Sequence, residues 1–255
     1  MPVKSDGNPG LHPPGSTPIS NFLLRTMAPD ALVRFQPLLV EVPLSLGQTL
    51  DIAGKPSPYV YFLTSGVCAV SCGPGEGDAV NVGLIGSEGM TGTSGLIAGG
   101  VASLSCNIIV PGRAYRIRTS DLLAVLETRP DATRLFGVYF RSLAIQAQYT
   151  AQAAVVAKLA ERIARLLLMI FDRGENDTLT MTHEALSFMV GVRRSGVTLA
   201  MQQLEYLGLI YSRRNAATLR DRSKLASYVG AHYGIPEANY ARLIGDFRRK
   251  DANGF

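Results

Sequence analysis

Residues 182–210 of the chain read THEALSFMVGVRRSGVTLAMQQLEYLGLI. Apolar residues recur there at helical spacing, and the pattern is broken at Gly191. Two arginines, Arg193 and Arg194, follow the break directly, where a second helix begins. The helix dipole disfavours positive charge at this end of a helix. The two arginines therefore gain nothing from the isolated helix, and their position indicates a surface that meets negative charge outside the chain.

The same stretch predicts two short helices joined by a tight turn. Thr182 is a favourable N-cap for the first helix, and Gly191 permits a turn that a Cβ atom would obstruct. The second helix is expected from about Arg193 to Leu207, and Gly208 ends it. Two short helices with a glycine-containing turn of about three or four residues are typical of a helix-turn-helix.

The segment that follows, GLIYSRRNAATLRDRSKL (208–225), predicts a β-hairpin. One strand is expected at 209–213 and the other at 217–220, with the turn at Asn215–Ala216. A hairpin in this place is a wing, so the whole predicts a winged helix-turn-helix.

Such a motif binds DNA through a small set of side chains. The N-terminal residues of its second helix enter the major groove. An arginine there can bond O6 and N7 of one guanine, worth about 1–3 kcal/mol of discrimination, while arginines at a wing tip hold phosphates. The predicted contacts with double-stranded DNA are Thr182, Arg193, Arg194, Ser195, Thr198, Arg213 and Arg214.

Charge is unevenly distributed along the 255 residues, whose net charge is +5. From Asp177 to the C-terminus, 11 Lys and Arg stand against 7 Asp and Glu, so four of the five net charges lie in the last third. This is typical of a domain with a phosphate-bearing partner. The 3 cysteines are too few for a disulfide scaffold, and no apolar run reaches the roughly 18–20 residues that span a bilayer. We expect a cytoplasmic protein with no membrane partner.

The segment from Val40 to about Ile117 has a different texture, in which short β-rich runs alternate with Gly, Pro, Asn and Ser. This pattern predicts an all-β sandwich or barrel. Within it, VYFLTSGVCAV (60–70) reads as two strands separated by a Thr-Ser-Gly turn.

A long helix is predicted over 131–157. Its approximate heptad stripe favours self-association, with a helix lying only on its own β domain as the alternative. The stripe consists of Leu135, Val138, Ser142, Ile145, Tyr149, Gln152 and Val156.

Several stretches resemble the Crp/Fnr superfamily of bacterial transcription regulators. They are YFLTSGVCAV (61–70), VGLIGSEGMTGTSGLIAGG (82–100), AERIARLLLMIFDR (160–173), LTMTHEALSFMVGVRRSGVTLAMQQLEYLGLIYSRR (179–214) and LRDRSKL (219–225). The resemblance covers about 21–228, and it implies a homodimer that regulates transcription, with DNA and RNA polymerase as partners.

The resemblance also fixes the expected fold class, which is α+β. It implies an N-terminal β jelly roll (a double-stranded β-helix), a long dimerisation helix and a C-terminal winged helix-turn-helix. The expected boundaries are 1–20 for a disordered tail, 21–130 for a cyclic-nucleotide-binding-like sensor domain, 131–157 for the dimerisation helix, 158–228 for the DNA-binding domain and 229–255 for a helical extension without an assigned role.

The chain departs from the family pattern where cyclic-AMP-binding members hold their ligand. Those members carry a Glu in a Phe-Gly-Glu segment and an Arg-Ser pair after it; here Thr93 and Ser103-Leu104 stand near these places. A cyclic phosphate buried without a cation is poorly compensated. We therefore expect an unknown effector rather than cyclic AMP bound in the usual way. The candidate effector pocket is Gly89, Thr91, Thr93 and Ser103.

In the second helix, Arg194 matches the guanine-reading arginine of the family, but Ser195 and Leu199 replace a common Glu and a second Arg. The DNA site therefore need not be that of the catabolite activator.

No cofactor or metal is expected. Iron–sulfur members of the family use four cysteines, mostly near the N-terminus, whereas this chain has 3, none before Cys68. A haem would need an axial ligand, and His12, His183 and His232 all lie outside the β region.

The main alternative from another class is a cupin-like β-barrel that binds a small molecule and has no role on DNA. Cupin enzymes need histidine and carboxylate ligands inside the barrel, and residues 40–117 contain no histidine. We expect no catalytic residues and no enzyme.

Overall fold

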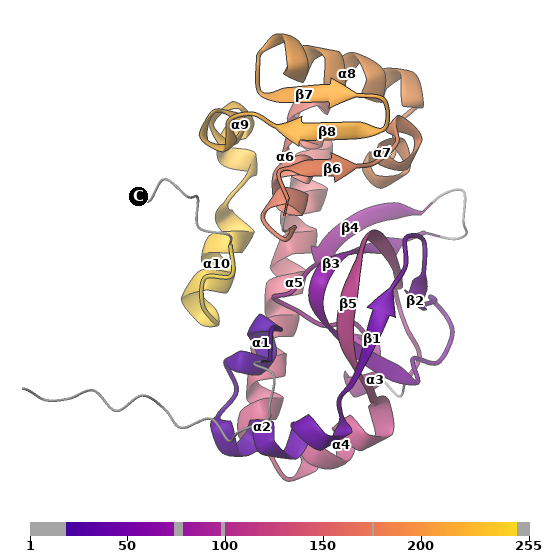
Figure 1. Ribbon diagram of the computed structural model, residues 1–255, viewed down its shortest axis with the longest axis vertical. Helices are drawn as coiled ribbons and strands as arrows, with labels where there is room; N and C mark the ends of the chain where they lie inside the picture. The colour runs from indigo at the N-terminus through magenta and orange to yellow at the C-terminus, as the bar shows by residue number, and fades with distance from the viewer. Residues whose placement is uncertain (1–18, 74–78, 98–99, 175, 249–255) are drawn as a thin grey trace, which may run out of the picture.

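The computed structural model describes residues 19–73, 79–97, 100–174 and 176–248. Figure 1 shows a curved antiparallel sheet beside a long central helix, α5 (Pro130–Val156), with a smaller domain at the far end of that helix. This arrangement confirms the predicted α+β class. The predicted tail at 1–20 lies almost wholly outside the described residues.

Five strands form the sheet of the N-terminal domain. Their order is β1-β5-β3-β4, β2 pairs with β5, and all the pairs are antiparallel. The strands are β1 (Val40–Leu44), β2 (Thr49–Asp51), β3 (Tyr59–Cys72), β4 (Val80–Ile85) and β5 (Ser105–Arg118).

The turn predicted at Thr-Ser-Gly in 60–70 is wrong, because β3 runs without a break through this segment. The register against β5 shifts between Leu63 and Ser65 and again before Val67, which marks a bulged strand. Gly66 has φ +79°, and a Cβ on Gly112 of β5 would lie 2.3 Å from the Ser65 carbonyl oxygen. Gly66 thus allows a bulge in a continuous strand instead of a chain reversal, and Gly112 allows the two backbones to approach closely.

Helices close one side of this domain. They begin with α1 (Phe22–Arg25) and α2 (Pro29–Phe35), which are followed by the 3₁₀ turn η1 (Gln36–Leu38). Two more, α3 (Thr93–Ile97) and α4 (Thr119–Glu127), complete the set before α5.

Helix α5 is fastened to the sheet domain by buried polar side chains. The Tyr139 hydroxyl donates to the carbonyl of Met90 and accepts from its amide, both at 3.0 Å. The Gln146 side chain does the same with both backbone groups of Leu84. Gly89 permits the contact, since a Cβ there would lie 2.2 Å from the Tyr139 oxygen.

The C-terminal domain is built around α6 (Leu159–Phe171), whose residues from Ile163 to Phe171 are all buried. Around it lie β6 (Thr178–Thr180), α7 (His183–Val190), α8 (Arg194–Tyr206), β7 (Ile210–Arg213), β8 (Ala216–Leu219) and α9 (Arg222–Val229). The core of this domain continues into the sheet domain through Val67, Ala69 and Leu84.

The C-terminal extension returns along the outside of α5, as Figure 1 shows. After the 3₁₀ turn η2 (Gly230–His232) it forms α10 (Ile235–Leu243). The Tyr240 hydroxyl donates to the Glu88 carbonyl of the sheet domain. Glu88 in turn pairs with Arg173 at 2.7 Å, and the two side chains are 3% exposed each. Three separate parts of the chain therefore meet at one buried ion pair.

Replacing one partner of this pair should destabilise the protein strongly. Glu88→Gln leaves the Arg173 guanidinium buried without its carboxylate, which costs about 3–5 kcal/mol in free energy of unfolding. The measurement is urea denaturation followed by circular dichroism. The matched control is Glu41→Gln, which removes the same charge from the exposed pair of Glu41 and Arg113 and should change the free energy of unfolding far less, because solvent screens an exposed pair. Equal small losses in both variants would contradict the role of the buried pair.

Candidate nucleic-acid interface

The first helix of the pair begins and ends as the sequence predicts. The Thr182 side chain accepts from the Ala185 amide at 3.0 Å and caps α7. Gly191 closes the helix with φ 64°, a left-handed conformation that costs a residue with a Cβ. The turn then passes into α8, which begins at Arg194 with Arg193 as its N-cap residue.

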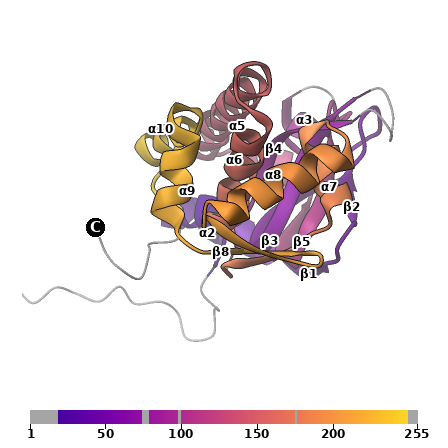
Figure 2. The same cartoon turned by 90° about the horizontal axis from the view of Figure 1, so that it is seen from above.

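The wing is confirmed as the hairpin of β7 and β8, with β6 pairing to β8 as a third strand that the sequence did not suggest. Arg214 and Asn215 form its tip, and Asn215 takes φ 57°. The Glu205 carboxylate accepts from the Ser212 amide at 3.0 Å, so the end of α8 holds the wing in place beside it. In Figure 2 the hairpin lies alongside α8.

A groove of about 430 Å³ runs between α7, α8 and the wing. Five of the seven predicted DNA contacts line it, namely Thr182, Arg194, Thr198, Arg213 and Arg214.

Most charged side chains that are exposed in the groove and make no ion pair within the described residues are basic. Arg194, Arg213 and Arg214 are exposed, and none of them makes an ion pair within the described part of the chain. Of the two acidic residues along it, Glu205 already accepts a backbone amide. Three guanidinium groups therefore face outward from one concave surface.

Thr198 is engaged inside the protein. Its hydroxyl lies 3.0 Å from Nδ1 of His183 and donates to the Arg194 carbonyl at 3.2 Å. The hydroxyl thereby joins α7 to α8, and this fixes the angle at which the second helix is presented.

The two adjacent arginines separate in space. Arg193 is exposed but borders a different depression, formed by the turn and by Val80 of β4. Ser195 is exposed at the start of α8 and does not line the groove. Arg193 is the N-cap residue and has an extended backbone (φ −70°, ψ 145°), whereas Arg194 is the first residue of α8, so the two side chains leave the backbone in different directions.

Gln202 is a groove residue that the sequence reasoning missed. It lies two turns after Arg194 on the same face of α8, is exposed and lines the groove. The spacing of eight residues from Arg194 is the signal that would have found it, because positions i, i+4 and i+8 share a helix face. Glutamine is a reader of adenine in the major groove.

The N-terminal domain holds a separate cavity of about 370 Å³ between the sheet and α5. Thr91, Thr93 and Ser103 of the candidate effector pocket line it. Gly89 does not, since it lies beneath the Tyr139 hydroxyl. The described residues include no cluster of three or more His, Cys, Asp or Glu side chains that could hold a metal ion.

The comparisons with known proteins agree with this geometry. Residues 161–228 match the family model of the Crp-like helix-turn-helix domain. A comparison with curated proteins found no match.

Solved structures match most of the chain, each at low identity. A protein from Eubacterium rectale assigned to the Crp/Fnr family of transcriptional regulators is 13% identical, with a TM-score of 0.65 over 81% of this chain and 97% of its own. FixK2 from Bradyrhizobium japonicum is 17% identical, with a TM-score of 0.62 over 76% and 98%. The c-di-GMP-responsive global regulator CLP from Xanthomonas campestris is 18% identical, with a TM-score of 0.61 over 76% and 100%.

The resemblance seen in the sequence is thus confirmed: a Crp-like helix-turn-helix lies within the fold of Crp/Fnr regulators. Among the helices that the structure describes, none combines the length and the apolar character needed to cross a bilayer.

The cap of α7 gives a direct test of the local structure. Thr182→Ala removes the acceptor for the Ala185 amide and should lower the free energy of unfolding by about 1 kcal/mol. Thr182→Ser keeps the hydroxyl and should lose much less. Both are measured by chemical denaturation, and an equal loss in the two variants would show that the hydroxyl is not the stabilising group.

Proposed function

We propose that this chain, a DNA-binding transcription regulator of the Crp/Fnr type, acts as a homodimer on a two-fold symmetric DNA site. Each protomer would read its half-site through α8. The observation that carries the proposal is the groove in which Arg194, Arg213 and Arg214 are exposed together. A duplex supplies the negative charge that these side chains lack among the described residues.

The side chains divide into two roles. Arg194, at the first turn of α8, and Gln202, two turns later, face the groove and suit contacts with base edges. Arg213 and Arg214 at the wing tip suit phosphates, as does Thr182 at the start of α7. Arg193 and Ser195 do not line the groove and are proposed to contact the DNA backbone beside it. Thr198 acts by holding α8 in position.

The dimer is proposed to form through α5. The sequence stripe is only partly available, since Ser142 is 6% exposed and lies beside Glu237 and Tyr240 of α10. A neighbouring line on α5 is exposed at alternating spacings of four and three. It consists of Gly137, Arg141, Ala144, Gln148, Ala151 and Val155.

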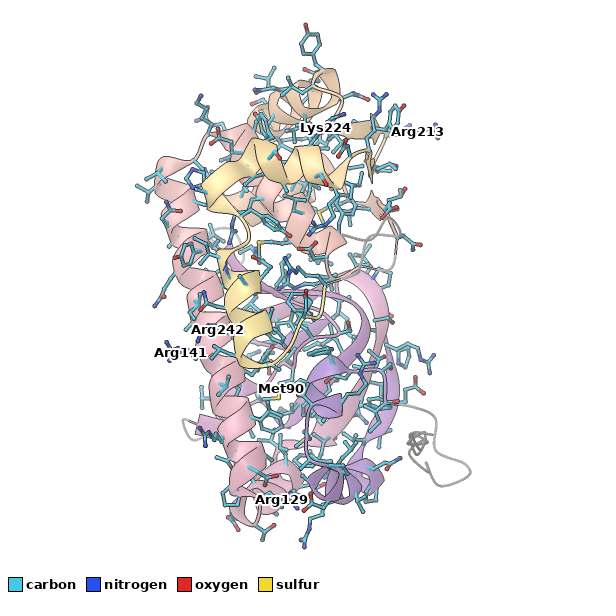
Figure 3. The ribbon with its side chains drawn as sticks, turned by 90° about the vertical axis from the view of Figure 1, so that its left-hand side faces the viewer. Met90, Arg129, Arg141, Arg213, Lys224 and Arg242 are labelled. Carbon is cyan, nitrogen blue, oxygen red and sulfur yellow. The ribbon has the colours of Figure 1, made fainter. Side chains whose placement is uncertain are left out.

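This exposed line has the spacing of a coiled-coil seam. Its small side chains allow two helix backbones to approach closely, and Val155 is 85% exposed in the single chain. Figure 3 shows Arg141 pointing away from the body on this outer side of α5. A pair of such helices would carry two reading surfaces to half-sites about 34 Å apart, one turn of DNA. A regulator of this type meets RNA polymerase at the promoter and works in the cytoplasm, where the chromosome lies.

Two arginine variants should affect DNA binding differently. Arg194→Ala should relax base preference at one position of each half-site, with a loss of about 1–3 kcal/mol on the preferred sequence. Arg213→Ala should weaken all sequences alike and reduce the slope of log K against log salt by about one. The site is selected from random duplexes, and binding is then measured by fluorescence anisotropy between 50 and 200 mM salt, a range of ~fourfold.

The control for both is Arg242→Ala. Arg242 lies beside α5, well away from Arg213 (Figure 3), and its loss should leave affinity and salt slope unchanged. If no sequence is enriched, or if Arg194→Ala behaves as Arg213→Ala does, the proposed reading by α8 is wrong.

The proposed dimer is tested by a charge placed on its seam. Ala151→Glu should convert the dimer to a monomer, because two like charges would meet between the helices. Sedimentation velocity measures the outcome. Val33→Glu is the control, as Val33 is 67% exposed on α2 and is not part of the proposed seam on α5. A monomeric unsubstituted protein, or an Ala151→Glu protein that stays dimeric, would contradict the proposal.

A further inference from the structure

Three buried polar atoms that have no hydrogen-bond partner among the described residues border the same cavity in the N-terminal domain. They are Oδ1 of Asp51, Oγ of Ser57 and Oγ1 of Thr91. The side chains are deeply buried, at 5%, 4% and 1% exposure. Buried polar groups are nearly always hydrogen-bonded in folded proteins. Three unsatisfied atoms around one cavity therefore point to a polar group that enters from outside the chain.

The position of Asp51 is fixed by its neighbours. Its other carboxylate oxygen, Oδ2, accepts from the Gly92 amide at 2.9 Å, and β2 pairs Asp51 with Cys106 of β5. The side chain thus presents one oxygen to the backbone and the other to the cavity. The two hydroxyls can donate or accept, but a carboxylate can only accept.

The remaining wall of the cavity is mostly apolar. Val70, Val82, Ile85 and Leu104 come from the sheet domain, and Phe140 and Leu143 from α5. Among the described residues Asp51 is the single charged side chain that lines it. The Cys106 thiol also borders it. A hydrogen bond with Cys68 and burial, together with the neighbouring Asp51 carboxylate, raise the pKa of Cys106 well above its usual value, which favours the neutral thiol.

From this combination we infer that the cavity binds a small organic amine, with its apolar part against the sheet and α5 and its ammonium group at Asp51, Ser57 and Thr91. An ammonium group has three donors, and the cavity offers three free oxygens. The volume falls near the lower end of the range of about 300–1,000 Å³ for small-molecule sites, which suits a compact ligand. A buried carboxylate attracts a cation strongly because the dielectric around it is low, and this attraction offsets the cost of removing water from the ammonium group.

The same arrangement selects against the anionic ligands that a phosphate-binding site would take. A phosphate would meet the Asp51 carboxylate in a low-dielectric cavity without any cation along the described wall. This inference rests on the proposed function only in one respect: it takes the N-terminal domain to be the part of the regulator that binds an effector. The binding itself is independent of DNA.

The test is a matched fragment series measured by isothermal titration calorimetry on the full chain without DNA. Each compact apolar body, such as a phenylethyl or cyclohexylethyl group, is presented as a primary amine, as an alcohol and as a carboxylate. Cyclic AMP completes the set. The amines are expected to bind at least tenfold more tightly than the alcohols, and the carboxylates and cyclic AMP should show no binding.

Variants locate the site. Asp51→Asn should reduce amine affinity at least tenfold and leave the alcohols within about threefold, because only the charge is lost. Thr91→Val removes one acceptor at constant shape and should weaken amines severalfold, so it tests the site even if Asp51→Asn fails to fold. The control is Glu41→Gln, an exposed carboxylate on β1, which should change nothing.

Three results would overturn the inference. The first is that none of the amines binds, which would leave a merely hydrated cavity. The second is equal or tighter binding of the carboxylates or of cyclic AMP. The third is amine binding that Asp51→Asn and Thr91→Val both leave unchanged. Loss of DNA binding in the Arg194 variant bears on none of these, so the two proposals fail separately.

Discussion

Two buried arginines, Arg165 on α6 and Arg173 just after its C-terminal end, constrain the arrangement of the parts around them. Arg165 and Arg173 are 5% and 6% exposed, and a buried guanidinium needs its donors satisfied. Nε of Arg165 donates to the His232 carbonyl at 2.9 Å, and its Nη1 donates to the Thr150 hydroxyl at 3.2 Å. Arg173 takes Glu88 from the sheet domain. The sheet domain, α5 and the C-terminal extension must therefore all converge on α6.

Glu237 of α10 explains why the extension stays there. It is 2% exposed, and neither of its carboxylate oxygens has a hydrogen-bond partner within the described ranges. Glu237 is compensated by the nearby charge of Arg173. Burial alone would lower the pKa of Arg173, but the carboxylates of Glu88, Glu237 and Asp172 together raise it. With α10 held in this way, one side of α5 is covered, and the exposed line from Gly137 to Val155 lies on another side. The same buried charges thus help to set both the domain orientation and the face of α5 that we propose for pairing.

The sequence predicted local elements well and long-range contacts poorly. The cap at Thr182, the turn at Gly191 and the wing all follow from residues a few positions apart, and the structure has them. The sequence predicted a turn at Gly66 where the structure has a bulge, because a glycine with positive φ is compatible with both. Only the pairing with β5 distinguishes a bulged strand from a turn here. The covering of Ser142 by α10 depends on a contact about a hundred residues away, which no periodicity encodes. The separation of Arg193 from Arg194 depends on where α8 begins, because Arg193 is an extended N-cap residue and Arg194 is the first helical one.

Strand β4 touches both functional regions. Val82, Gly83 and Ile85 line the cavity of the N-terminal domain. Val80, at the start of the same strand, meets the helix-turn-helix turn, where a Cβ on Gly191 would lie 3.0 Å from its Cγ1. A ligand shifts a conformational equilibrium only by the difference in its affinity for two states. The contact of Val80 with Gly191 is one place where such a difference could act, because the turn at Gly191 directly precedes α8. Arg194 is the first residue of α8, so a shift of this strand edge would move the arginine that we propose reads DNA.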